Sequence, residues 1–338
     1  MRIAMVLDSW DNEANGAVVS TRRFTEWQRA AGHEITIVAN AAPEPGVVPL
    51  PTFEVPFFGG IMRRMKFQFA RPDRGILAGV LARHDLIHIQ FPFWLGVRAM
   101  RMARRAGVPT VATFHVQGEH ILYNVGVRSD ALIALVYRLF LRTVYDHADC
   151  VVCPSGFTER ELRRYGLRAP SVVISNGVPS IFRPAPPGTG PRRDELERLG
   201  AMLTNPPIFD FVSTEDLIPY YSAAVLCVHA SEVEVEGMAA LEALACGAPC
   251  LIADAPRSAT PQFALDERYR FASGSPDALV AKLDALLDDP VRLGADRERA
   301  LELARSYRFE LSAEKLVALY GEVLQARGIR PVVRQEFH

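Results

Sequence analysis

The sequence lacks any uninterrupted apolar run of the ~18 residues that a membrane-spanning helix requires. Its opening stretch, MRIAMVLDSW, holds an apolar run much shorter than that of a secretory signal peptide, and acidic residues follow at once. The expectation from these two absences is residence in the cytoplasm.

Cysteine is scarce and odd in number, with five in 338 residues, which argues against a disulfide framework. Cys150 and Cys153 form a CxxC pattern in DCVVCPS. The segment is typical of a β-strand, in which residues three apart point to opposite faces of the sheet. The pair therefore cannot bind one metal ion, and we expect both thiols to lie in the core.

Net charge is also nearly absent. A formal charge of -1 provides no global attraction for nucleic acid, so no nucleic-acid partner is expected. With 49% hydrophobic residues, the chain has enough apolar material for the two cores that its length suggests.

The first half alternates short β-rich segments with helical patterns, of which the first helix is expected at about 17–31. This alternation predicts a doubly wound parallel sheet, whose ligands collect at the carboxyl ends of the strands. Gly16, His115, Ser155 and Asn176 each follow a predicted strand. The predicted strands are MRIAMVLD, HEITIVAN, DLIHIQF, TVATFHV, DCVVCPS and SVVISNGV.

A Pro/Gly-rich stretch, RPAPPGTGPRR at 183–193, indicates a linker, and a second α/β pattern follows it. Its predicted strands are IFDFV, VLCVHA and PCLIAD, and the last predicted helix covers about 312–327. The fold class is α/β with two Rossmann-like domains. We expect an acceptor-side domain at 1–180 and a donor-binding domain at 181–311. Residues 312–338 should form a helix and tail that pack back toward the first domain.

The stretch SEVEVEGMAALEALACGAP, at 231–249, places Glu242 inside an apolar helical run. A helix beginning near Gly237 would aim free backbone N–H groups at an anion, and glycine would let the anion approach. A buried carboxylate needs donors, and a vicinal diol supplies two. Together these features indicate a nucleotide sugar. The alternative is that Glu232, Glu234 and Glu236 complement the helix dipole while Glu242 pairs with an arginine.

The spacing E-x7-E from Glu234 to Glu242, followed by LEALACGAPCLIAD, resembles the donor-site motif of retaining glycosyltransferases of the GT-B fold, family four. Further matching pieces occur in the family's order, from Met1 to about Tyr320, and the FHVQxE pattern is similar to bacterial lipid or diacylglycerol glycosyltransferases. These pieces are the loop with Gly16, GHEITIVA, GVPTVATFHV, PSGFTERELRRYG, and ISNGV before Phe182 and Pro184.

The resemblance implies a role for each matching residue. Glu234 should face the donor sugar, with His115 across the cleft, and both are expected to be catalytic. Glu242 should hold the ribose diol. Backbone N–H groups for the sugar or diphosphate should come from Gly237, Met238 and Ala239, and Gly16 should let its loop approach the diphosphate. The partners that the resemblance implies are a nucleotide sugar, for which we expect a UDP linkage, and a lipid or glycan acceptor. The family needs no metal or other cofactor, and the sequence has no DxD triplet.

One part of the family pattern is missing. After ISNGVPSIFRPAPP the chain continues into GTGPRRDELERLGA, without the strand and the Arg/Lys loop that bind the diphosphate in the family. About one βαβ unit is absent, so the second domain is expected to be truncated. Arg192 and Arg193 could substitute as cations. The alternative function is therefore a catalytically impaired GT-B protein that binds a sugar nucleotide or a partner. A GT-B-type sugar-nucleotide epimerase is disfavoured by the E-x7-E spacing.

Residues 53–72, FEVPFFGGIMRRMKFQFARP, interleave five phenylalanines with Arg63, Arg64, Lys66 and Arg71. Aromatic and basic residues together suit the surface of an anionic membrane. The alternative is a core-facing strand and helix with solvated arginines. The resemblance to lipid glycosyltransferases favours peripheral contact at the inner face of the plasma membrane.

Overall fold

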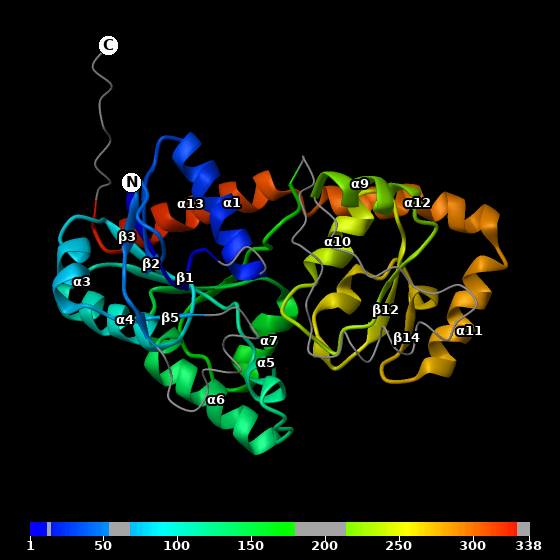
Figure 1. The fold of residues 1–338 in the computed structure, drawn as a ribbon, viewed down its shortest axis with the longest axis horizontal. Helices are drawn as coiled ribbons and strands as arrows, with labels where there is room; N and C mark the ends of the chain where they lie inside the picture. Colours follow the sequence, from blue (N-terminus) through cyan, green and yellow to red (C-terminus); the bar gives the residue numbers. More distant parts are fainter. Residues whose placement is uncertain (12–14, 54–67, 180–213, 330–338) are drawn as a thin grey trace, which may run out of the picture.

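The computed structural model describes residues 1–11, 15–53, 68–179 and 214–329 (Figure 1). Within these ranges the chain forms two α/β halves. Figure 1 shows the first half from blue to green on the left and the second half from yellow to orange on the right.

A seven-stranded parallel sheet forms the first half, in the order β3-β2-β1-β6-β7-β8-β9. Helices return the chain between most of these parallel strands, whereas residues 41–46 join β2 to β3 without a helix. The strands are β1 (Arg2–Ser9), β2 (Glu34–Asn40), β3 (Val47–Pro49), β6 (Leu86–Ile89), β7 (Thr110–Thr113), β8 (Cys150–Cys153) and β9 (Ser171–Val173). The helices are α1 (Gly16–Ala30), α3 (Arg74–Leu81), α4 (Trp94–Ala106), α5 (Gly118–Asn124), α6 (Asp130–Thr143) and α7 (Gly156–Arg164). A short antiparallel pair, β4 (Thr52–Phe53) and β5 (Phe69–Ala70), and a 3-10 turn, η1 (Tyr145–His147), complete this half.

Each face of the first sheet has its own apolar core. One core takes side chains from α3, α4 and α6, and the other takes them from α1 and α13 (Phe309–Ala326). Cys153 lies in the former and Cys150 in the latter. The prediction that the CxxC thiols point to opposite faces is therefore confirmed.

The second half holds a three-stranded parallel sheet in the order β10-β12-β14 and a two-stranded parallel pair, β11 with β13. The strands are β10 (Cys227–His229), β11 (Val233–Glu234), β12 (Cys250–Asp254), β13 (Arg257–Ser258) and β14 (Arg270–Ala272). The helices are α9 (Thr214–Ala223), α10 (Met238–Ala245), α11 (Pro276–Leu287) and α12 (Pro290–Arg305), with 3-10 turns η2 (Thr260–Phe263) and η3 (Glu267–Tyr269). The predicted strand at 208–212 and the junction of the missing unit both lie outside the described residues.

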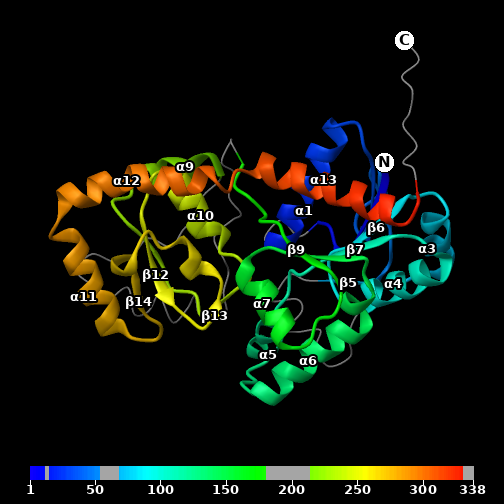
Figure 2. The same ribbon diagram turned by 180° about the vertical axis from the view of Figure 1, so that it is seen from behind.

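The C-terminal helix α13 returns to the first half. Figure 2 shows it crossing from the second half to lie over the first sheet, where Leu316, Tyr320 and Leu324 are buried. Two connecting segments run side by side at the crossing, since the Phe309 N–H donates to the Val178 carbonyl at 2.9 Å. A Cβ at Gly177, where φ is +68°, would lie 2.6 Å from the Phe309 Cα, so only glycine allows this approach.

No helix in the described ranges is long and apolar enough to cross a membrane.

Candidate functional site

Loops at the carboxyl ends of β7, β8 and β9 contact the segment that leads into α10. The Ser155 hydroxyl donates to the Val235 carbonyl at 2.7 Å, and the His120 Nε2 lies 3.1 Å from the Val233 carbonyl. Asn176, after β9, reaches the same segment, since its side chain donates to Glu236 at 2.5 Å. The candidate site is therefore the boundary between the two halves.

Glu236 is the most completely bonded carboxylate of this boundary. Its Oε2 accepts from the Asn176 side chain at 2.5 Å and from the Asn176 backbone N–H at 3.0 Å, and the Ser175 hydroxyl donates to Oε1. Asn176 in turn accepts from the Ser20 hydroxyl at 2.5 Å. Complete burial nevertheless raises the pKa of Glu236 to about 7. This carboxylate holds the two halves together rather than awaiting a ligand.

Glu242 has a different environment. It lies on α10 and is 6% exposed, and Arg23 of α1 approaches its Oε1 at 3.6 Å across the boundary. Burial raises the pKa of Glu242 to about 7, and Arg23 offsets only part of this shift. A well-formed guanidinium–carboxylate hydrogen bond is ~2.7–2.9 Å long, so the contact with Arg23 is loose. The sequence alternative of an arginine partner is therefore present, but it leaves acceptor capacity on the carboxylate.

Glu234 ends the short strand β11 and faces His229, whose Nε2 lies 3.7 Å from the Glu234 Oε1. Burial raises the pKa of Glu234 to about 7, while Ser231 opposes the shift. Burial also lowers the pKa of His229, so the imidazole tends to be neutral and this contact adds little charge compensation. A carboxyl group with a pKa near neutrality can exchange a proton during a reaction.

His115 follows β7, as predicted, and its Nε2 lies 3.0 Å from Gln90 Oε1. Burial lowers the pKa of His115 to about 4, so the ring is neutral near pH 7. Since Nε2 donates to Gln90, Nδ1 is the acceptor nitrogen of this neutral ring. Burial and the nearby His115 lower the pKa of His88 to about 3.

A small cavity lies between His115 and helix α1. Its volume is about 20 Å³, and Ser20, Thr21, Gln90 and Asn176 are among its lining residues. This is room for about one water molecule and is far too small for a nucleotide sugar.

The N-terminus of α10 has no side-chain cap, so its first N–H groups, at Met238 and Ala239, remain directed along the helix axis. Gly237 precedes them with φ at +96°, and an added Cβ would meet the Thr260 Oγ1 at 2.7 Å. The structure thus gives a reason for Gly237 that the sequence did not predict, namely a left-handed backbone packed against Thr260.

Gly16 is the first residue of α1. Asn15 caps this helix, since its side chain accepts from the Ala17 N–H at 2.9 Å. An added Cβ at Gly16 meets nothing within 4 Å. Its surroundings are therefore open on this side, although residues 12–14 before it lie outside the described ranges.

Sequence reasoning missed a set of contacts around Arg257, on β13. Its side chain reaches Asp130 at 2.5 Å and Glu119 at 3.5 Å, and it donates to the Tyr123 hydroxyl. The Gln117 amide also donates to the Arg257 carbonyl at 3.1 Å. These residues come from the FHVQxE stretch and α6, so they join the halves beside His115. The FHVQxE pattern was the signal in the sequence that could have pointed to these contacts, but the partner residue, Arg257, is distant in the sequence.

Within the described residues, no group of three or more His, Cys, Asp or Glu side chains is arranged to hold a metal ion. The predicted membrane segment falls largely on residues 54–67, which lie outside the described ranges.

Comparison with known proteins places these features in a family. Residues 14–180 match the family model "Glycosyltransferase Family 4", and residues 188–306 match "Glycosyl transferases group 1". A sucrose-phosphate synthase from Thermosynechococcus elongatus has a similar fold, with a TM-score of 0.75 at 19% identity over 96% of this chain and 100% of that one. An Anabaena protein, HepE, in complex with UDP-glucose aligns at a TM-score of 0.67 and 15% identity over 95% of this chain and 100% of that one. The predicted GT-B fold is therefore confirmed.

Among curated proteins, an alpha-monoglucosyldiacylglycerol synthase of Streptococcus pneumoniae is 25% identical over 53% of this chain and 41% of its own length. A GDP-mannose-dependent alpha-mannosyltransferase of Mycolicibacterium smegmatis is 31% identical over 46% of this chain and 42% of its own length. The chain thus spans about two-fifths of the length of these relatives. With the two family models covering 14–180 and 188–306 in turn, the chain belongs to glycosyltransferase family 4.

Proposed function

We propose that the protein is a retaining glycosyltransferase that moves a hexose from a nucleoside-diphosphate sugar to a hydroxyl group of a lipid or glycan acceptor. The observation that carries this proposal is Glu242, a buried carboxylate held only loosely by Arg23 at the boundary between two GT-B halves. Its remaining acceptor capacity suits the two hydroxyls of a ribose.

The surrounding residues supply what the transfer requires. As the bond from the anomeric carbon to the diphosphate breaks, negative charge grows on the leaving group. The uncapped N–H groups of Met238 and Ala239 would stabilise it, together with Arg23. Glu234 would face the sugar, and the neutral His115 would contact it from the first half. The acceptor oxygen forms the new bond to the anomeric carbon as the nucleoside diphosphate leaves, and its proton passes to an oxygen of the departing diphosphate.

The nucleotide base and the acceptor are narrower proposals. Three curated relatives are named GDP-mannose-dependent alpha-mannosyltransferases, and one is named an alpha-monoglucosyldiacylglycerol synthase. HepE, whose fold is similar, is bound to UDP-glucose. We propose a UDP-linked donor and a lipid acceptor such as diacylglycerol, in line with the FHVQxE resemblance.

A panel of donors tests the proposal. Purified protein is incubated with UDP-glucose, UDP-galactose or GDP-mannose, with and without diacylglycerol in mixed micelles, and release of nucleoside diphosphate and glycolipid is measured. Turnover with one UDP-sugar, abolished in His115→Ala and kept in the surface variant Glu232→Gln, supports it. Turnover with GDP-mannose alone would refute the UDP assignment. Binding of donors without any turnover would refute the proposed transferase activity.

The second candidate, a binding protein without turnover, is favoured by the sequence junction at Pro187–Gly188. There the chain lacks the Arg/Lys loop that the family uses at the diphosphate. Losing one such preorganised contact lowers the rate by ~10²–10³. Peptide mass spectrometry comes first, because a peptide that joins Pro187 to Gly188 proves the junction. With the junction proven, we expect donor binding, and transfer lower by at least this factor than in a variant carrying the restored unit.

A further inference from the structure

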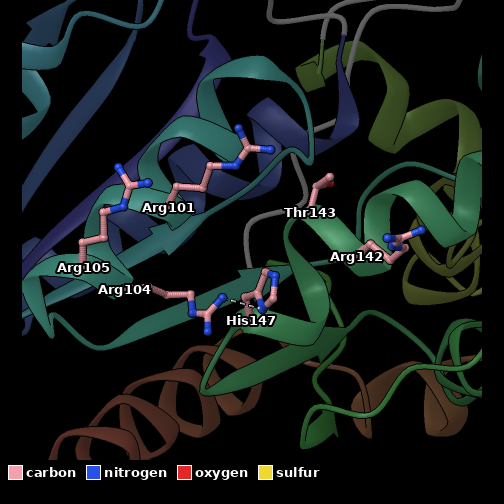
Figure 3. A pocket seen from close by; sticks show the side chains of 6 residues that line it. All are labelled: Arg101, Arg104, Arg105, Arg142, Thr143 and His147. Carbon is pink, nitrogen blue, oxygen red and sulfur yellow. Dashed lines mark hydrogen bonds between the residues drawn. The ribbon is translucent and has the colours of Figure 1, made fainter.

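A pocket of about 450 Å³ opens between the C-terminal ends of α4 and α6, and none of the candidate-site residues described above lines it. Figure 3 shows Arg101, Arg104 and Arg105 entering it from one side and Arg142 from the other. Thr143 and His147 complete the lining.

The pocket is strongly basic in a chain of net charge -1. Arg104 donates to the His147 Nδ1 at 2.9 Å, which fixes the guanidinium without neutralising it (Figure 3). Burial, with the charge of Arg104, lowers the pKa of His147, so this imidazole serves as an acceptor. Among the described residues, no carboxylate forms an ion pair with Arg101, Arg104, Arg105 or Arg142.

Compensation of helix dipoles explains part of this charge, because Arg104, Arg105 and Arg142 lie in the last turns of their helices. Arg101 lies before the last turn of α4, and the arginines of two helices converge on one pocket. Four cations around one hollow also repel one another, so the arrangement favours an anion that all of them can contact.

The exposed face of α6 continues from this pocket as an apolar surface. Leu132, Leu135 and Leu139 are 43%, 59% and 56% exposed, and they precede Arg142 at spacings of three, four and three residues. Such spacing places all four on one side of a helix. In both views α6 lies on the outer rim of the first half (Figures 1 and 2). Contiguous apolar surface rimmed by polar residues marks sites of interaction with proteins or membranes.

We propose that this face, made of the α4–α6 arginine pocket and the three leucines of α6, docks on a bilayer of anionic phospholipids. The arginines bind lipid phosphates, and the leucines enter the boundary between headgroups and acyl chains. A nucleic acid or a soluble phosphate would use the arginines but would leave the leucines in water. The geometry therefore favours the membrane.

The docking face and the candidate site lie at opposite ends of helix α6. Asp130, the first residue of α6, contacts Arg257 of the second half, whereas Arg142 in its last turn lines the pocket. Fourteen residues of helix are ~20 Å long, so a bilayer along α6 would extend to the boundary where the proposed donor site lies. The inference does not depend on the proposed transferase activity, because membrane binding is measured without a donor.

Co-sedimentation of the full chain with vesicles tests the proposal. The vesicles are phosphatidylglycerol mixed with phosphatidylcholine, or phosphatidylcholine alone, at low and high salt. The test variant is Arg101→Gln/Arg104→Gln/Arg142→Gln, and a second variant is Leu135→Ser/Leu139→Ser. The control, Arg160→Gln/Arg292→Gln/Arg305→Gln, removes the same charge from exposed arginines of α7 and α12.

We expect binding only to the anionic vesicles. Each arginine removed should weaken it about fivefold at low salt, so the pocket variant loses on the order of 100-fold and the control much less. The leucine variant should lose binding even at high salt, where screening has already weakened the charges. Binding by the pocket variant equal to that of the control would overturn the proposal. So would a chain that binds inorganic pyrophosphate or a 20-mer RNA through these arginines but does not bind anionic vesicles.

Discussion

Replacement of Glu242 by glutamine is the sharpest test of the proposed donor site. The change keeps the size of the side chain but turns one acceptor oxygen into an NH₂ donor. In the structure this group faces the boundary, with Arg23 at 3.6 Å as its cation. If the ribose hydroxyls donate to both oxygens of Glu242, glutamine can accept only one of them. We therefore expect weaker nucleotide binding in a protein that is still folded.

The expected loss follows from the strength of charge-assisted hydrogen bonds. These contribute ~1.5–3 kcal/mol, which corresponds to an increase in Kd of roughly 10- to 150-fold. A pH dependence should accompany it. Burial raises the pKa of Glu242 to about 7, and only the ionised carboxylate accepts from both hydroxyls. Affinity for UDP-glucose should then fall as the pH falls through 7, by roughly tenfold between pH 8 and pH 6.

Isothermal titration with UDP-glucose at several pH values provides the measurement. The matched control is Glu232→Gln, since Glu232 lies in the same segment but is exposed and pairs with Arg128. Glu234 and Glu236 also have pKa values near 7, so only the part of the pH dependence that disappears in Glu242→Gln belongs to Glu242. Unchanged affinity in a folded Glu242→Gln protein would refute the ribose role.

Three further changes test the structure around the site. Burial raises the pKa of Glu236 from 4.5 to about 7, so folding favours the protonated form of this carboxyl group. The free energy of unfolding should therefore fall by up to ~3 kcal/mol as the pH rises from 4.5 to 7. Glu236→Gln should flatten this pH profile when stability is measured by urea titration. Gly237→Ala should destabilise the protein by ~1–3 kcal/mol through strain and the clash with Thr260, whereas Gly294→Ala, in open space within α12, should stabilise it slightly; equal melting temperatures would contradict the strain argument. Arg257→Gln leaves the buried carboxylate of Glu119 without its cation, which should destabilise the protein by ~1–3 kcal/mol and lower its melting temperature. The radius of gyration in X-ray scattering should increase. An unchanged radius would show that other contacts hold the halves together.

Local patterns predicted the elements of the fold closely. The first helix was expected at about 17–31 and occupies Gly16–Ala30, because a strand-like run before it and an apolar helical period within it both constrain its position. The opposite directions of Cys150 and Cys153 follow from the two-residue period of a strand. In each case the deciding interactions lie within a few residues along the chain.

The contacts across the boundary could not be predicted in the same way. Arg23 precedes Glu242 by more than two hundred residues, and nothing in the helical pattern of α1 distinguishes it from Arg22 or Arg29. Arg257 and Glu119 were missed for the same reason. The packing of Gly237 against Thr260 was not predicted either, because Thr260 comes from a separate element. Local sequence patterns therefore predicted the elements, whereas the contacts between distant segments could not be read from them.

The contrast between Glu236 and Glu242 separates a structural carboxylate from the one that we propose binds the donor. Both are buried and both have a raised pKa, so burial alone does not distinguish them. Glu236 receives hydrogen bonds from Ser175 and Asn176 at hydrogen-bonding distance, whereas the cation described for Glu242 remains 3.6 Å away. A diphosphate entering the boundary would offer Arg23 a second anion, and the ribose would offer Glu242 two donors. The loose pair could then be exchanged for two tighter contacts, so donor binding would not leave a buried charge uncompensated.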